Sequence, residues 1–126
     1  MEKVLRDAYE AGVILAGLSA GAICWFEQGL TASTPGTYTK LECLGLLSGS
    51  CSPHYDVESN RRLRMHDLVG SGKLFPGYGI ENSCAIHYSE GEISRVISSV
   101  EGKAAYQIFL DGEIVKEEKI PADLLE

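Results

Sequence analysis

The sequence predicts a single α/β domain with a β-hairpin region at its carboxyl end. Short apolar runs alternate with segments of helical periodicity in the first two thirds of the 126-residue chain. Turn dipeptides typical of hairpins, Glu90-Gly91 and Asp111-Gly112, appear only in the last third. Hydrophobic residues make up 44% of the chain, enough for the core of one domain but not of two.

The first third of the chain predicts a helix, a strand, a second helix and a loop. Glu2 to Ala11 has apolar residues at helical spacing, and Gly12 stands where a C-cap is expected. Val13 to Ala16 is all apolar, which favours a strand buried on both faces of a parallel sheet. Ala20 to Phe26 is predicted as a helix, and Gly29 to Tyr38, rich in Gly, Thr, Ser and Pro, as an irregular loop.

The rest of the chain continues this alternation and then changes to hairpins. Leu44 to Leu47 is a second apolar strand candidate, and Glu58 to Val69 is a polar helix that Gly70-Ser71-Gly72 ends. A short segment bordered by glycines follows Pro76 as a further strand candidate. The predicted hairpin strands are Ala85 to Tyr88, Ile93 to Ile97, Tyr106 to Leu110 and Glu113 to Lys116.

Composition and charge argue against several classes of protein. The net charge of −7 disfavours binding to nucleic acid or to anionic lipid. We find neither an apolar run long enough to cross a membrane nor the basic and apolar regions of a signal peptide, so a cytoplasmic location is expected. The cysteines form no C-x-x-C pair and are expected to be reduced, and no metal site is predicted. The four cysteines are Cys24, Cys43, Cys51 and Cys84.

A pentapeptide between the first predicted strand and helix carries the strongest chemical signal. Gly17-Leu18-Ser19-Ala20-Gly21 matches G-x-S-x-G, in which a tight strand-to-helix turn projects the serine hydroxyl. Its small residues let neighbouring backbone approach, and the amide of Ala20 is expected to be an oxyanion donor. The alternative is a plain β-α turn with Ser19 as an N-cap.

A serine nucleophile needs a base, and His54 is the best of the three histidines. It follows the second strand candidate in Ser52-Pro53-His54-Tyr55, so it is predicted to lie at the same sheet edge as Ser19. His66 lies in a predicted helix and His87 in a hairpin, where a packed or solvated imidazole is expected. Glu81 is the candidate to orient the base, with Glu42 and Asp56 as competitors. The order Ser, His, acid disfavours the α/β-hydrolase fold.

These segments together resemble the peptidase E family, the S51 serine peptidases, which include aspartyl dipeptidases and cyanophycinases. Gly17 to Ala22 resembles the family's nucleophile elbow, Ser52 to Tyr55 its N-P-H-F segment, and Gly79-Ile80-Glu81-Asn82 its L-P-E-G/N segment. The resemblance implies a class I glutamine-amidotransferase-like, flavodoxin-like sheet, with Ser19 as nucleophile, His54 as base and Glu81 as third member. Amidotransfer itself is disfavoured because its usual nucleophile is a cysteine, and position 19 is serine.

The resemblance covers residues 1–126 as one domain that corresponds to the carboxyl-terminal half of the family's catalytic domain. The family's G-G-N turn, expected to supply a second oxyanion donor, has no counterpart in this chain, and Leu30 to Pro35 lacks the acid some members carry there. Substrates with an N-terminal aspartate imply a cationic partner. Arg61, Arg62 and Arg64 open the polar helix; the pattern does not distinguish them, and Arg61 and Arg62 are the predicted substrate-binding residues.

The sequence is compatible with two functions. The first is a serine-type peptidase that hydrolyses small peptides, Asp-X dipeptides among them, through an acyl-enzyme and without metal or organic cofactor. The second is a truncated half-subunit, silent alone, that forms a homodimer or binds a complementing N-terminal chain through an uncovered sheet edge.

Overall fold

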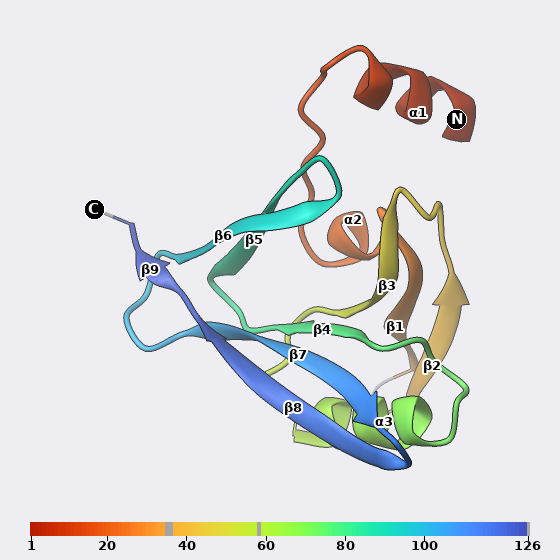
Figure 1. Ribbon diagram of the computed structural model, residues 1–126, viewed down its shortest axis with the longest axis vertical. Helices are drawn as coiled ribbons and strands as arrows, with labels where there is room; N and C mark the ends of the chain where they lie inside the picture. Colours follow the sequence, from red (N-terminus) through yellow and green to blue (C-terminus); the bar gives the residue numbers. More distant parts are fainter. Residues whose placement is uncertain (35–36, 58, 126) are drawn as a thin grey trace.

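The structure is a computed structural model that describes residues 1–34, 37–57 and 59–125. Its described elements are two sheets and three helices arranged along the chain as Figure 1 shows. The helices are α1 (Glu2–Glu10), α2 (Ala20–Ile23) and α3 (Ser59–Gly70). The strands are β1 (Phe26–Thr34), β2 (Thr37–Glu42), β3 (Leu47–Ser52), β4 (Gly77–Ile80), β5 (Cys84–Ser89), β6 (Glu92–Ser98), β7 (Ala104–Asp111), β8 (Ile114–Pro121) and β9 (Asp123–Leu124).

The larger sheet is mixed and has parallel strands at its centre. Its order is β2-β1-β3-β4-β7-β8, with β1, β3 and β4 parallel to one another and the outer pairs antiparallel. The smaller sheet has the order β5-β6-β9. Parallel strands joined through a helix confirm the predicted α/β class, and the arrangement is consistent with a flavodoxin-like fold.

The main core lies between α3 and one face of the larger sheet. Leu30 on β1, Met65 on α3 and Ile108 on β7 are fully buried there. On the opposite face of β1, Gly29 leaves room for Ile23 of α2, whose side chain occupies the place of a Cβ at position 29. Because adjacent strand residues point to opposite faces, α2 and α3 cover different faces of the sheet.

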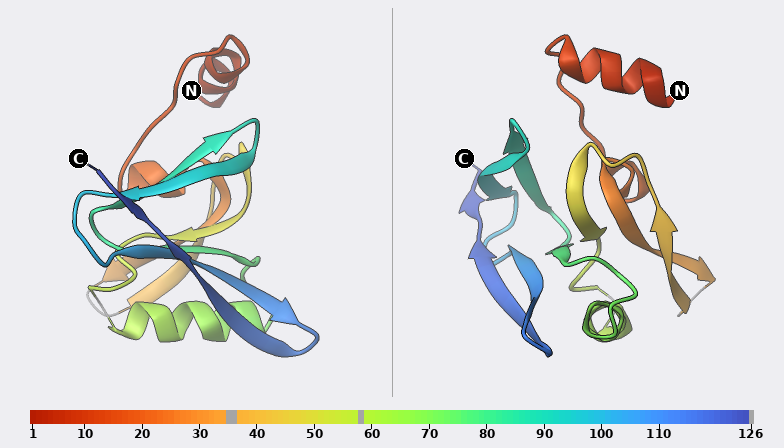
Figure 2. Two further views of the ribbon diagram at one scale, coloured as in Figure 1. Left: turned by 60° about the vertical axis from the view of Figure 1, so that its left-hand side comes forward. Right: turned by 45° about the vertical axis from the view of Figure 1, so that its right-hand side comes forward.

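The first eighteen residues lie outside the two sheets, and Arg6 of α1 donates a hydrogen bond to the carbonyl of Leu44 at 3.0 Å. Figures 1 and 2 show α1 beyond the two sheets, connected by an extended segment. The predicted buried strand Val13–Ala16 is wrong for the described residues: it forms no sheet pairing with them, and Ile14 is 91% exposed. An all-apolar run indicates a tendency to be buried, but a strand forms only where a neighbouring strand takes its backbone hydrogen bonds.

The two predictions that follow the serine also need correction. The helix expected at Ala20–Phe26 ends at Ile23, and β1 begins at Phe26. The expected loop Gly29–Tyr38 is strand on both sides of residues 35–36, which lie outside the described residues. Phe26, Gln28 and Leu30 are all buried, a period of two that fits a strand. Ile23 and Phe26, three apart, imitate helical spacing.

The second predicted strand is displaced toward the carboxyl end. The sequence predicts Leu44–Leu47, whereas β3 starts at Leu47 and runs to Ser52. After Leu47 this strand is built of small residues, and the chain around β4 lies close to it: a Cβ at Gly49 of β3 would be 2.7 Å from the carbonyl oxygen of Pro76, and a Cβ at Gly77 of β4 would be 2.0 Å from that of Ser50. Tight packing of small polar residues produces no apolar run that a sequence pattern could reveal.

The other elements confirm the prediction. The helices at Glu2–Glu10 and Ser59–Gly70 form, although Glu58, the predicted first residue of the second, lies outside the described residues. Gly12 after α1 has φ +89° and Gly72 after α3 has φ +77°. The four predicted hairpin strands appear as β5 to β8, and the short segment after Pro76 is β4. None of the described helices is long and apolar enough to cross a membrane.

Candidate active site

The serine of the G-x-S-x-G segment sits in a strained turn directly before α2. Ser19 has φ 55° and ψ −120°, a conformation that costs a residue with a side chain about 1–3 kcal/mol. Gly17 permits the turn, since a Cβ there would lie 2.2 Å from the carbonyl oxygen of Gly21. A Cβ at Gly21 would meet nothing within 4 Å. The first glycine is therefore the one that the turn requires.

The turn brings the serine hydroxyl to the imidazole predicted as its base. Oγ of Ser19 lies 2.9 Å from Nε2 of His54, a hydrogen bond between residues 35 positions apart. His54 follows β3 and also has a positive φ, 56°. Backbone strain at both partners of one contact is typical of a functional site, where the surrounding fold holds residues in conformations they would otherwise leave.

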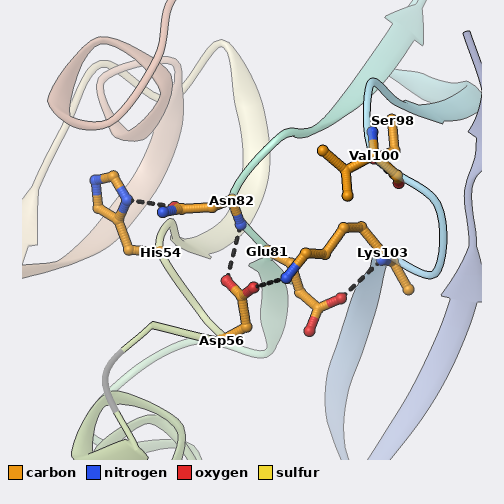
Figure 3. A network of polar contacts seen from close by, with 8 residues as sticks. His54, Asp56, Glu81, Asn82, Ser98, Val100 and Lys103 are labelled. Carbon is orange, nitrogen blue, oxygen red and sulfur yellow. Dashed lines mark hydrogen bonds and ion pairs between the residues drawn. The ribbon is translucent and has the colours of Figure 1, made fainter.

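Asn82 occupies the position expected for Glu81. Nδ1 of His54 donates a hydrogen bond to Oδ1 of Asn82 at 2.6 Å (Figure 3). With the proton on Nδ1, Nε2 is free to accept from the hydroxyl of Ser19, which is the tautomer a general base needs. An amide oxygen performs this orienting task in papain-like Cys-His-Asn sites.

The carboxylate of Glu81 is used inside the fold instead. Its Oε1 accepts a hydrogen bond from the amide of Ala104 at 2.8 Å, which ties the end of β4 to the start of β7. The expected contact between Glu81 and His54 is thus not formed. Glu81 and Asn82 lie in the turn after β4, where Asn82 faces the imidazole while Glu81 contacts the start of β7. Sequence reasoning singled out the carboxylate because of its charge and passed over the amide beside it.

The two competitors for the orienting role lie in different places. Glu42 on β2 accepts from Nε2 of Gln28 at 3.3 Å and pairs with Lys40. Asp56 lies next to the site: its Oδ1 accepts from the backbone amide of Asn82 at 2.8 Å (Figure 3). Asp56 thus bonds the backbone of the residue that contacts His54.

The amide of Ala20, the predicted oxyanion donor, is the first of α2 and follows the serine directly. The amides of Ala22 and Ile23 both bond the carbonyl of Ser19, whereas the backbone bonds of this turn, within the described residues, leave the amide of Ala20 unused. The first amides of a helix have no partner within it. This donor is available to an oxygen bound beside Ser19.

The predicted substrate arginines are engaged in the fold. Arg61 is 4% exposed, donates to the carbonyl of Leu30 at 3.0 Å and lies over the ring of Tyr38. Arg62 pairs with Glu117 at 3.2 Å and lies over two tyrosine rings. Both side chains hold α3 to the sheet, and the structure does not bring them to the Ser19–His54 pair.

A partly buried polar cluster anchors Tyr55, the residue next to His54. The hydroxyl of Tyr55 donates to Glu117 at 2.6 Å, and His66 lies 3.0 Å from the same carboxylate oxygen. Burial raises the pKa of Glu117, but Tyr55, His66 and Arg62 together outweigh burial and leave that pKa below its ordinary value. The Tyr55 ring also fills the space that a Cβ at Gly79 would need. His66 is thus a packed imidazole, and His87 is exposed on β5.

Comparison with known proteins decides the family. The model of peptidase family S51 matches residues 1–96, which is more than half of the chain. The chain belongs to peptidase family S51. The S51 match includes Ser19, His54, Glu81 and Asn82.

One curated relative extends over nearly the whole of this S51 chain. An uncharacterized peptidase of Bacillus subtilis, YgaJ, is 39% identical to it over 125 residues, which are 99% of this chain and 54% of that protein. The chain therefore spans about half the length of the curated relative it matches. Within the described residues, no three His, Cys, Asp or Glu side chains are grouped to hold a metal ion.

Proposed function

We propose that this protein hydrolyses small peptides as a serine-type peptidase, with Ser19 as nucleophile and His54 as general base. The observation that carries the proposal is the 2.9 Å hydrogen bond between Oγ of Ser19 and Nε2 of His54. Distances of about 2.6–3.2 Å between nucleophile and base are those required for proton transfer. Membership of a peptidase family and likeness to a peptidase-named relative support the same reaction.

The chemistry follows the usual order for acyl transfer. Oγ of Ser19 attacks the peptide carbonyl carbon as its proton passes to Nε2 of His54, and the carbonyl oxygen becomes an oxyanion near the amide of Ala20. The imidazolium then gives that proton to the leaving amine, and the C–N bond breaks. Water, deprotonated by His54, hydrolyses the acyl-enzyme and restores the serine.

Asn82 is the positioning residue in this proposal. It replaces the predicted Ser-His-Glu arrangement by Ser-His-Asn, because its amide oxygen is the acceptor at Nδ1 of His54. A neutral acceptor fixes the tautomer but stabilises the imidazolium less than a carboxylate does. We therefore expect the chemical step to be slower than in an otherwise similar Ser-His-Asp site.

The expected substrate class rests on the family resemblance, because Arg61 and Arg62, the predicted substrate-binding residues, are engaged in the fold. Small peptides, with Asp-X dipeptides as the first candidates, are the expected substrates. The experiment is hydrolysis of Asp-Leu by the purified chain, together with covalent labelling by a fluorophosphonate, each compared with Ser19→Ala. Labelling that maps to Ser19 and cleavage above the control support the proposal. Absence of both rejects it.

A second candidate function is assembly, and the exposed amino-terminal segment favours it. Val13, Ile14 and Leu18 are 53%, 91% and 84% exposed, although they lead directly into the Ser19 turn. Apolar side chains on an extended, unpaired backbone are typical of segments that another strand covers. In this candidate a second copy or a complementing chain adds strands beside Val13–Ala16, and the chain alone is silent.

Light scattering at several concentrations tests the assembly candidate. A dimer that dissociates in Ile14→Glu would support self-association, since a buried carboxylate without a partner is costly at an apolar contact. Val57→Glu is the matched control, because Val57 is also exposed but lies outside the segment. A monomer at every concentration that labels at Ser19 would contradict the assembly candidate and favour the first function.

A further inference from the structure

A chain of polar contacts continues behind the imidazole, away from the serine. The imidazole of His54 bonds the side chain of Asn82, and the backbone amide of Asn82 in turn donates to Oδ1 of Asp56 at 2.8 Å. The other oxygen of Asp56 accepts from Nζ of Lys103 at 2.5 Å. Figure 3 shows these contacts in sequence, from the imidazole at one end to the lysine at the other.

The contacts join three segments that are distant in sequence. Asp56 is two residues after His54, Asn82 follows β4, and Lys103 directly precedes β7. Asp56 accordingly links the turn that carries the imidazole to the segment that carries its acceptor. A turn with φ 56° at His54 relies on such outside contacts to keep its geometry.

The ion pair between Asp56 and Lys103 is partly shielded and its carboxylate is charged, so it can hold Asp56 in place. The side chain of Asp56 is 15% exposed and that of Lys103 32% exposed, so the pair is partly shielded from water. Burial by itself raises the pKa of Asp56, but the hydrogen bonds from Lys103 and from the Asn82 amide outweigh it and hold the pKa below its ordinary value. Asp56 is thus ionised at neutral pH and accepts both bonds at once.

Lys103 lies in the connection between β6 and β7, and hydrogen bonds fix both ends of this connection. Ser98, 2% exposed, donates to the carbonyl of Val100 at 2.7 Å and accepts from the amide of Val100 at 3.0 Å. On the other side of Lys103, the amide of Ala104 bonds Glu81 at 2.8 Å. Lys103 lies outside residues 1–96 that the S51 model matches, so it is a contribution of this carboxyl-terminal hairpin region.

From this arrangement we propose that Asp56 and Lys103 are positioning residues for the reaction: together they set Asn82 against Nδ1 of His54. The inference rests on the proposed function, because it concerns the base of that reaction. Without the pair, the Asn82 backbone loses its acceptor, and the imidazole loses the contact that selects the Nδ1–H tautomer. The strands β4 and β7 are also joined independently of this pair, by their antiparallel pairing and by the hydrogen bond from the Ala104 amide to Glu81.

The first test measures the rate at which a fluorophosphonate labels Ser19. We expect Lys103→Met, which removes the cation, and Asp56→Ala, which removes the acceptor, each to slow labelling about tenfold or more, because small displacements of a base have effects of this size. Lys103→Arg, which keeps the cation, should recover most of the rate. Lys116→Met is the matched control: it removes a Lys–Asp pair of 2.7 Å with Asp111 in the β7–β8 hairpin. Its rate should equal that of the native chain.

The second test measures the tautomer of the His54 imidazole directly. In the native protein, nitrogen-15 NMR of the histidine rings should show the proton of His54 on Nδ1. Lys103→Met should convert this signal to a mixture of tautomers, and Lys116→Met should not. Lys103→Gln serves as a second variant if Lys103→Met does not fold by circular dichroism.

The two measurements separate the two proposals. If the native protein is not labelled but Lys103→Met still changes the His54 tautomer, the peptidase proposal fails and the positioning role stands. If Ser19 is labelled, and folded variants at both positions leave the labelling rate and the tautomer as in the native protein, the positioning role is overturned.

Discussion

Oδ1 of Asn82 lies 2.6 Å from Nδ1 of His54, so the imidazole that faces Ser19 is held from behind by an amide and not by a carboxylate. An amide side chain carries an acceptor and a donor, and only the acceptor leaves Nε2 free to take the serine proton. The tautomer of the imidazole therefore depends on how Asn82 is placed.

Asn82→Ala should lower the rate constant for labelling of Ser19 by about 10- to 100-fold, no more than the low end of the about 10²–10⁴-fold that acid–base catalysis contributes, because the base itself remains. The imidazole then has no acceptor at Nδ1 and divides between two tautomers. Asn82→Asp should instead keep or raise the rate, since a carboxylate also stabilises the imidazolium. A rate in Asn82→Ala equal to the native rate would exclude the orienting role of Asn82.

The glycines of the elbow should differ in their tolerance of a methyl group. In Gly17→Ala the new Cβ would lie 2.2 Å from the backbone oxygen of Gly21, which cannot move without shifting Ser19. Labelling of Ser19 should be lost. Gly21→Ala is the matched control, because its Cβ meets nothing within 4 Å, and it should label normally. Equal behaviour of the two variants would contradict the geometry of the turn.

Strain at the nucleophile predicts an unusual stability change. The free energy of unfolding of Ser19→Gly should be about 1 kcal/mol larger than that of Ser19→Ala, since glycine adopts φ 55° at little cost and alanine does not. Urea denaturation of the two inactive variants measures this difference. A less stable glycine variant would mean that the serine backbone is not under strain.

Acid should weaken the anchor of the histidine turn. Burial raises the pKa of Glu117, but the contacts with Tyr55, His66 and Arg62 lower it by more. The pKa of Glu117 is therefore lower in the folded than in the unfolded protein. Its contribution is therefore present above the unfolded pKa, about 4.3, and is lost as pH falls through the lower folded value. Asp56 acts in the same direction.

Urea denaturation from about pH 6 to about pH 3 checks this prediction. The free energy of unfolding should decrease below about pH 4.5, and less steeply in Glu117→Gln, which does not titrate. Identical slopes for the variant and the native chain would show that Glu117 does not have the lowered pKa.

Arg61 should contribute to the stability of the fold and not to the choice between substrates. Arg61→Met removes a buried hydrogen bond to the Leu30 carbonyl and a cation–π contact with Tyr38, and should cost about 2 kcal/mol of unfolding free energy. The ratio of kcat/KM for Asp-Leu and Leu-Leu should stay as in the native chain. A selective loss on Asp-Leu with native stability would restore the sequence-based prediction for Arg61.

Sequence reasoning worked best where local chemistry sets local structure. The Ser19 turn needs a glycine at position 17, where a Cβ would lie 2.2 Å from the carbonyl oxygen of Gly21, and the hairpin at Gly112 needs a positive φ, here +66°. His54 directly follows the central strand β3, and the turn after that strand brings its imidazole to Ser19. In each instance the signal lies within a few residues of the feature it predicts.

The errors arise where the outcome depends on distant partners. Whether Val13–Ala16 forms a strand depends on a neighbour, and none of the described residues provides one. The strand β3 has few apolar residues, and at Gly49 a side chain is excluded by the carbonyl oxygen of Pro76, which is distant in sequence. The choice of Asn82 over Glu81 depends on the direction in which the chain leaves β4. No pattern of spacing encodes that direction.

The most direct test of the central claim, that His54 activates Ser19, is the second-order rate constant for fluorophosphonate labelling of the native protein and of His54→Ala, with the modified residue mapped by mass spectrometry. Activation by His54 predicts modification of Ser19 alone and a rate at least about 100-fold lower in His54→Ala. Equal rates in the two proteins, or modification of another serine in the native protein, would contradict it.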